Sequence, residues 1–144
     1  MTSFSLSPES PDPQGPSEPV EPSHEGDAAD DADDQPSTVL CFNANDPSGA
    51  GGIAADLTAM ASVGVHALPV VTSVLVRDTG ETTACHPLDE DAIDDQARAA
   101  LEDIDIDLFK IGFAGSAEAL ATIAAIVSDY DEVPVVTYVP NIGW

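Results

Sequence analysis

A glycine-rich segment with carboxylates on both sides is the part of this sequence best equipped for chemistry. It runs from Asn43 to Asp56, with Asp46 before three closely spaced glycines and Asp56 after them. Backbone N–H groups in such a turn, next to a helix N-terminus, bind polar or anionic ligands. The segment therefore predicts a ligand-binding loop.

The elements on either side must position this segment. Residues 39–42 (Val-Leu-Cys-Phe) form an apolar run typical of a short buried strand. Ile53, Leu57 and Met60 follow at the i, i+4 and i+7 spacing of a helix. The turn is therefore expected at the carboxyl end of a strand, where open α/β sheets bind ligands.

Strand and helix patterns alternate along the rest of the chain. This alternation predicts an α/β fold with a mostly parallel sheet flanked by helices. Gly64 is expected to close the first helix, residues 77–87 to form a connection with a short extended piece at 82–85, and Leu120, Ile123 and Val127 to face inward from the last helix. The expected strands are 38–42, 67–76, 106–111 and 133–139, and the expected helices are 52–63, 89–102 and 116–128.

Acidic residues dominate the composition. The 144 residues include 27 acids and only three bases, Arg77, Arg98 and Lys110, for a net charge of −24. Residues 1–38 hold seven of the twelve prolines, ten of the acids and no base, which predicts a disordered acidic tail. Residues 39–144 then form the folded part, whose 17 acids and three bases leave a net charge of −14.

This charge limits the partners. A domain so acidic is poorly suited to bind nucleic acid or an anionic membrane, and no apolar stretch is long enough to cross a bilayer. Adaptation to a salt-rich interior explains the missing lysines better than a basic partner does. Cys41 and Cys85 indicate no disulfide framework, which suits a cytoplasmic protein. The acids of residues 89–95 spread around a helix, so no metal site is expected.

Several interpretations of the glycine loop compete. A P-loop requires Gly-Lys-Ser/Thr, and here Ile53 follows the last glycine. Gly49, Gly51 and Ala54 fit a dinucleotide fingerprint, and Arg77 then suggests a 2′-phosphate contact in an NADP-dependent oxidoreductase fragment. In a purely structural interpretation, the glycines make a tight turn that Asp46 caps, and the helix dipole stabilises Asp56 in the first turn. Lys110 then extends to solvent and Cys41 fills the core.

Residues 41–57, CFNANDPSGAGGIAADL, resemble the opening motif of hydroxymethylpyrimidine/phosphomethylpyrimidine kinases, which have a ribokinase-like fold and act in thiamine biosynthesis. The resemblance runs from residue 39 to about residue 140. Further motifs at the family's spacing are 62–66, 70–73, 78–79, 101–103 and 110–112.

The resemblance implies ATP-dependent, Mg²⁺-assisted phosphorylation of 4-amino-5-hydroxymethyl-2-methylpyrimidine, of its monophosphate, or of both. It implies that the loop residues Asp46, Gly49 and Gly51 and the helix acid Asp56 bind the pyrimidine, with Ala44 where a family glycine approaches the ring. Arg77 replaces a glutamine that binds the pyrimidine edge, and it is expected to pair with Asp56 or Asp78, or to meet a substrate phosphate.

The sequence also departs from the family at its end. Tyr138-Val139-Pro140 replaces the family's Asp-Pro-Val, and a tryptophan follows soon after the last core strand. We expect the chain to be the N-terminal part of a longer protein whose other half supplies the catalytic residues and most of the ATP site. A non-catalytic pyrimidine-binding or regulatory remnant is the alternative. A small pyrimidine is the expected partner, and homodimerisation is left open.

Overall fold

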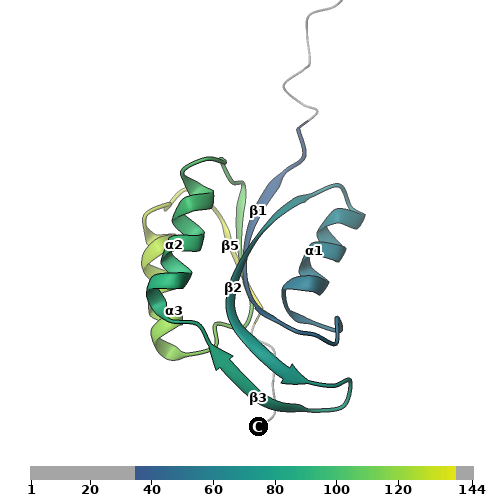
Figure 1. The fold of residues 1–144 in the computed structure, drawn as a ribbon. Helices are drawn as coiled ribbons and strands as arrows, with labels where there is room; N and C mark the ends of the chain where they lie inside the picture. The colour runs from purple at the N-terminus through teal and green to yellow at the C-terminus, as the bar shows by residue number, and fades with distance from the viewer. Residues whose placement is uncertain (1–34, 139–144) are drawn as a thin grey trace, which may run out of the picture. The chain divides into compact units, whose positions relative to one another are not determined.

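A five-stranded sheet with helices on both faces carries the predicted site. The computed structural model describes residues 35–138, in which α1 covers one face of the sheet and α2 and α3 cover the other (Figure 1). The strand order is β3-β2-β1-β4-β5, and only β3 is antiparallel to its neighbour. The elements are β1 Thr38–Asn45, α1 Gly52–Ser62, β2 His66–Arg77, β3 Thr82–Pro87, α2 Glu90–Leu101, β4 Leu108–Ile111, α3 Ala117–Ser128 and β5 Val135–Thr137.

Strand β1 lies at the centre of the sheet and delivers the site. It runs three residues beyond the expected end at residue 42, because Asn43 and Asn45 continue to pair with Val71 and Val74 of β2. The register shifts between these two pairs. Ala44 is buried at 1% exposure, so it belongs to the strand and not to the turn.

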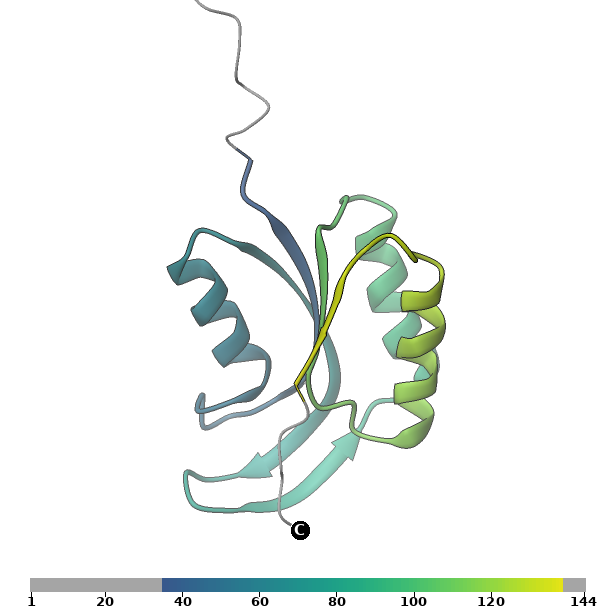
Figure 2. The same cartoon turned by 180° about the vertical axis from the view of Figure 1, so that it is seen from behind.

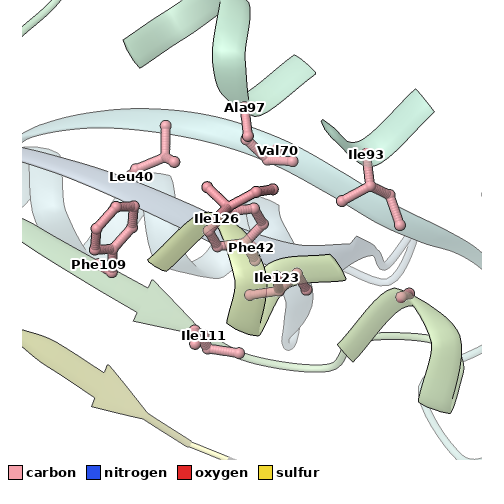
Figure 3. Packing of buried hydrophobic residues seen from close by; sticks show 10 residues of the cluster. Leu40, Phe42, Val70, Ile93, Ala97, Phe109, Ile111, Ile123 and Ile126 are labelled. Atoms are coloured by element: carbon pink, nitrogen blue, oxygen red, sulfur yellow. The ribbon is translucent and has the colours of Figure 1, made fainter. Parts of the chain in front are cut away.

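Side chains of β1 alternate between two apolar cores, as the pleat of a strand requires. On the α1 face, Val39 and Cys41 pack with Ile53. On the α2–α3 face, Leu40 and Phe42 join the larger cluster, which Figure 3 shows between the strands and the two helices. The buried members of that cluster are Leu40, Phe42, Val70, Ile93, Ala97, Phe109, Ile111, Ala119, Ile123 and Ile126.

The helix ends follow from their caps. Gly64 has a φ of +77° directly after the C-cap of α1, which confirms its expected place as the closing glycine. Asp89 and Ser116 cap α2 and α3 by accepting hydrogen bonds from Ala92 and Ala119. The first helix begins at Gly51 without a side-chain cap.

Two local expectations were right only in part. The extended piece expected at residues 82–85 is confirmed, but it is a full strand, β3, that pairs with β2 as a hairpin, seen below the helices in both views (Figure 2). In α3, Ile123 is buried and Val127 packs against the core as expected, whereas Leu120 is 49% exposed. The buried residues Ala119, Ile123 and Ile126 follow the i, i+4, i+7 spacing of a helix, and Leu120 lies one position off this stripe.

Some expectations concern residues outside the described range. The acidic tail was assigned to residues 1–38, of which the structure describes only 35–38, and Thr38 there begins β1. The Val139-Pro140 departure also lies outside. None of the helices in residues 35–138 is long and apolar enough to cross a membrane.

Candidate ligand-binding site

Asp46 organises the loop that follows β1. Its backbone oxygen accepts a hydrogen bond from Gly49 N–H at 3.2 Å. Its Oδ1 accepts from the backbone N–H and the hydroxyl of Ser48, at 2.9 and 2.7 Å. Asp46 is only 3% exposed, and its hydrogen bonds stabilise the turn from the buried side. This agrees with its structural interpretation as a capping residue.

Glycines allow the loop to fold back onto the strand. Gly52 has a φ of +64°, and a Cβ there would lie 2.4 Å from the backbone oxygen of Ala44. Gly51 and Gly52 then border a cavity together with the uncapped start of α1. Backbone N–H groups in the first turn of a helix have no intrahelical partner, so this border is rich in donors.

Asn43, Asp56 and Lys110 form a connected polar group on three different elements. Asp56 Oδ2 accepts from Asn43 Nδ2 at 2.8 Å and from Lys110 Nζ at 2.5 Å. The Lys110 and Asp56 side chains are 13% and 16% exposed. Lys110 therefore does not extend to solvent, and the side chain of Asp56 is oriented by two donors.

Asn43 and Lys110 are the members of this polar group that sequence reasoning missed, and Asn43 has the larger set of partners. Its Oδ1 accepts from the backbone N–H groups of Ala44 and Phe113, at 2.9 and 3.1 Å. A Cβ on Gly112 would come within 2.5 Å of the Asn43 side chain, so a glycine is needed opposite it. Its place at the end of a buried strand was a usable signal, since a buried amide requires partners.

Arg77 reaches the loop from the end of β2. Its Nη1 lies 3.4 Å from Asp46 Oδ2, and its Nε donates to the backbone oxygen of Asp78 at 3.0 Å. Of the partners expected from the sequence, Asp56 is wrong, because Arg77 pairs with Asp46 while Asp56 Oδ2 binds Lys110 and Asn43. Arg77 does contact Asp78, through its backbone oxygen. Contact with a substrate phosphate stays a prediction.

These groups surround a cavity of about 450 Å³, within the usual range for small-molecule sites. Three of the predicted site residues, Gly51, Asp56 and Arg77, line it. Ala44 and Asp46 are buried in the strand and loop that support it, and Gly49 is not part of its wall. The complete lining is Asn43, Ala50, Gly51, Gly52, Ala55, Asp56, Arg77, Lys110 and Tyr138.

Cys41 lies near Asp56 and Lys110, but its thiol is unreactive. Burial raises the pKa of its thiol to about 11, the nearby Asp56 charge adds to the rise, and Lys110 partly offsets it. The thiol is fully buried and contacts the sulfur of Met60 at 3.5 Å. Because the thiolate is the reactive form, Cys41 acts as core filler and not as a nucleophile.

A donor-rich cavity at the carboxyl ends of β1, β2 and β4, above a mostly parallel sheet, is the arrangement of a ribokinase-like small-molecule kinase domain. Solved structures agree with this class. The phosphomethylpyrimidine kinase of Clostridium difficile 630 superposes with a TM-score of 0.65 at 29% identity, covering 70% of this chain and 44% of that one. An ADP complex of Bacillus subtilis pyridoxal kinase, 23% identical, has the same fold with a TM-score of 0.65 over 71% of this chain and 40% of that one.

The family model for phosphomethylpyrimidine kinase matches residues 46–138, and the chain belongs to this family. The hydroxymethylpyrimidine/phosphomethylpyrimidine kinase of Mycobacterium tuberculosis is 37% identical over 90 residues, which are 62% of this chain and 33% of the relative. The thiamine biosynthesis multifunctional protein ThiED of Corynebacterium glutamicum is 32% identical over 98 residues, 68% of this chain and 13% of the relative. The resemblance seen in the sequence is confirmed, and the chain spans about a third of the single-function relative.

Proposed function

We propose that this chain is the acceptor-binding part of a kinase that phosphorylates 4-amino-5-hydroxymethyl-2-methylpyrimidine, its monophosphate, or both, in thiamine biosynthesis. Membership of the family supports the reaction type. The observation that carries the assignment of the pyrimidine to this cavity is the orientation of Asp56. Its Oδ2 is occupied by Asn43 and Lys110, and its Oδ1 has no hydrogen-bond partner within residues 35–138.

The open oxygen suits an amino group. A carboxylate is an acceptor only, and an exocyclic amine donates to it in a charge-assisted hydrogen bond. Lys110 and Asn43 hold the Asp56 side chain in place, so no side-chain reorganisation is needed when the ring enters. The backbone N–H groups at Gly51 and Gly52 supply donors for ring nitrogens on the same wall.

We assign no site for the phosphoryl donor and no catalytic residue to residues 35–138. Within that range, no three His, Cys, Asp or Glu side chains gather. Mg²⁺ is commonly held by one or two carboxylates together with substrate phosphates, so its place is proposed to be with the donor. The ATP that the family membership implies is proposed to bind elsewhere in the complete kinase, whose cytoplasmic location suits the free thiols of Cys41 and Cys85.

Binding of hydroxymethylpyrimidine and of NADPH to the chain, measured by calorimetry, tests the proposal. We expect binding of the pyrimidine and none of NADPH. Asp56→Asn removes the charge that orients the amino group, and we expect it to weaken pyrimidine binding by roughly 1.5–3 kcal/mol. Asp103→Asn is the matched control, because Asp103 is exposed and lies between α2 and the amino end of β4, at the other end of the sheet.

Three results would contradict the proposal or favour one of its alternatives. Binding of NADPH alone would favour the dinucleotide interpretation of the glycine loop. Equal losses of pyrimidine affinity in the Asp56 and Asp103 variants would show that Asp56 does not contact the pyrimidine. If the pyrimidine binds while the complete protein with its natural continuation transfers no phosphoryl group, the non-catalytic pyrimidine-binding alternative is favoured, for which the exchange of an amide for Arg77 is the supporting feature.

A further inference from the structure

The few basic residues of this chain are not distributed at random. The sequence has three bases against 27 acids, and two of them, Arg77 and Lys110, line the same cavity. The third, Arg98, lies on α2 and binds Asp94 at 2.9 Å and Asp129 at 3.3 Å. An anionic ligand is repelled by a chain with a net charge of −24. At the cavity, Arg77 and Lys110 balance the charges of Asp46 and Asp56, so this repulsion is locally reduced and the two cations offer donors to an anion.

Both cations retain donors after their protein contacts are counted. Arg77 uses Nε on the Asp78 backbone and Nη1 on Asp46, while its Nη2 has no partner within the described range. Lys110 has three donors, and one binds Asp56. The Arg77 side chain is 20% exposed, so its guanidinium is partly shielded from water yet reaches the cavity.

The remaining donors select for a particular kind of ligand. A guanidinium offers donors in a planar fork and no acceptor, and it matches two oxygens of a phosphate. An amide in its place would offer one donor and one acceptor, which suits a neutral ring edge. Asp46 sits behind Arg77 and is buried, so it holds the guanidinium without blocking the cavity side.

We infer that Arg77, assisted by Lys110, binds an oxyanion carried by the ligand, and that the cavity prefers the phosphomonoester of the pyrimidine to the free alcohol. This inference rests on the proposed function for the identity of the ring. Arg77 is then the residue that determines specificity between the two substrates that the family name and its relatives suggest.

Calorimetry of the chain with phosphomethylpyrimidine, hydroxymethylpyrimidine and inorganic phosphate, at one fixed ionic strength, tests this. We expect the phosphorylated ligand to bind about tenfold tighter or more than the alcohol, the scale of one charge-assisted contact. Arg77→Gln should remove that preference. Arg98→Gln loses the same charge outside the cavity and should keep it.

Two further variants distinguish a loss of phosphate recognition from a loss of folding. Arg77→Gln leaves the buried Asp46 without its cation, so the double variant Asp46→Asn with Arg77→Gln removes both charges, and circular dichroism verifies its fold. Arg77→Lys restores a cation without the planar fork and should recover part of the preference.

The outcomes separate this inference from the proposed function. Equal affinity for alcohol and phosphomonoester would overturn the inference and leave the pyrimidine assignment standing. Phosphate binding that depends on Arg77, without any binding of a pyrimidine, would support the anion site and refute the proposed function. Equal loss in the Arg77 and Arg98 variants would show that only the net charge matters, and would overturn the inference.

Discussion

Replacement of Gly52 by alanine tests the loop geometry on which the cavity depends. Gly52 has a φ of +64°, and Gly49 three residues before it has a φ of +69°. An alanine at either position carries the cost of the left-handed region, about 1–2 kcal/mol. Gly49→Ala is therefore a matched control that has the same backbone cost.

The two sites differ in the space around them. A Cβ on Gly49 meets nothing within 4 Å, whereas a Cβ on Gly52 lies 2.4 Å from the Ala44 oxygen and 2.9 Å from the Asp46 Cβ. Ordinary contact begins at 3.4 Å, so the loop must move by about 1 Å. Such overpacking typically costs about 1–3 kcal/mol beyond the backbone cost.

Urea unfolding followed by circular dichroism measures both variants. We expect Gly52→Ala to lower the free energy of unfolding by about 2–5 kcal/mol and Gly49→Ala by about 1–2 kcal/mol. Gly52→Ala should also abolish pyrimidine binding, because the displaced loop borders the cavity. Equal destabilisation by the two variants would refute the close approach of Gly52 to β1.

Three other properties of the chain can be measured directly. The melting temperature should rise as KCl is added, because the Debye length falls from ~30 Å at 0.01 M to ~3 Å at 1 M and screens the −14 charge of residues 39–144; a flat or falling curve would favour a basic partner instead. A thiol reagent at pH 8 should modify Cys85 in the native chain and reach Cys41 only in denaturant. Because burial raises the pKa of Cys41 from 9.0 to about 11, the unfolded chain loses this thiol proton at a lower pH than the folded chain does. The free energy of unfolding should therefore fall by about 2 kcal/mol as the pH rises from 9 to 11. A Cys41→Ser variant with an unchanged profile over that range would contradict this.

The sequence by itself determined the order and type of the elements other than β3, for which it indicated only a short extended piece. Each depends on a local pattern: the apolar run before Asn43, the helical spacing of Ile53, Leu57 and Met60, and the glycine after α1. Asp46 as a turn cap follows from the same kind of information, since its partner Ser48 is two residues away. Local hydrogen bonds and periodicity of this kind are readable without knowing the rest of the fold.

Tertiary structure alone decided which of these residues meet. The contact of Asp56 with Lys110 joins residues 54 positions apart, and that of Arg77 with Asp46 joins residues 31 positions apart. Sequence reasoning offered Asp56 or Asp78 as the partner of Arg77 and did not find Asp46. Because β4 pairs with β1, Lys110 lies within hydrogen-bond distance of Asp56, and Gly112 lies against Asn43. Strand order therefore set the pairing of charges around the cavity, because a carboxylate binds the donor that the packed sheet holds nearest to it, and separation along the chain does not reveal which donor that is.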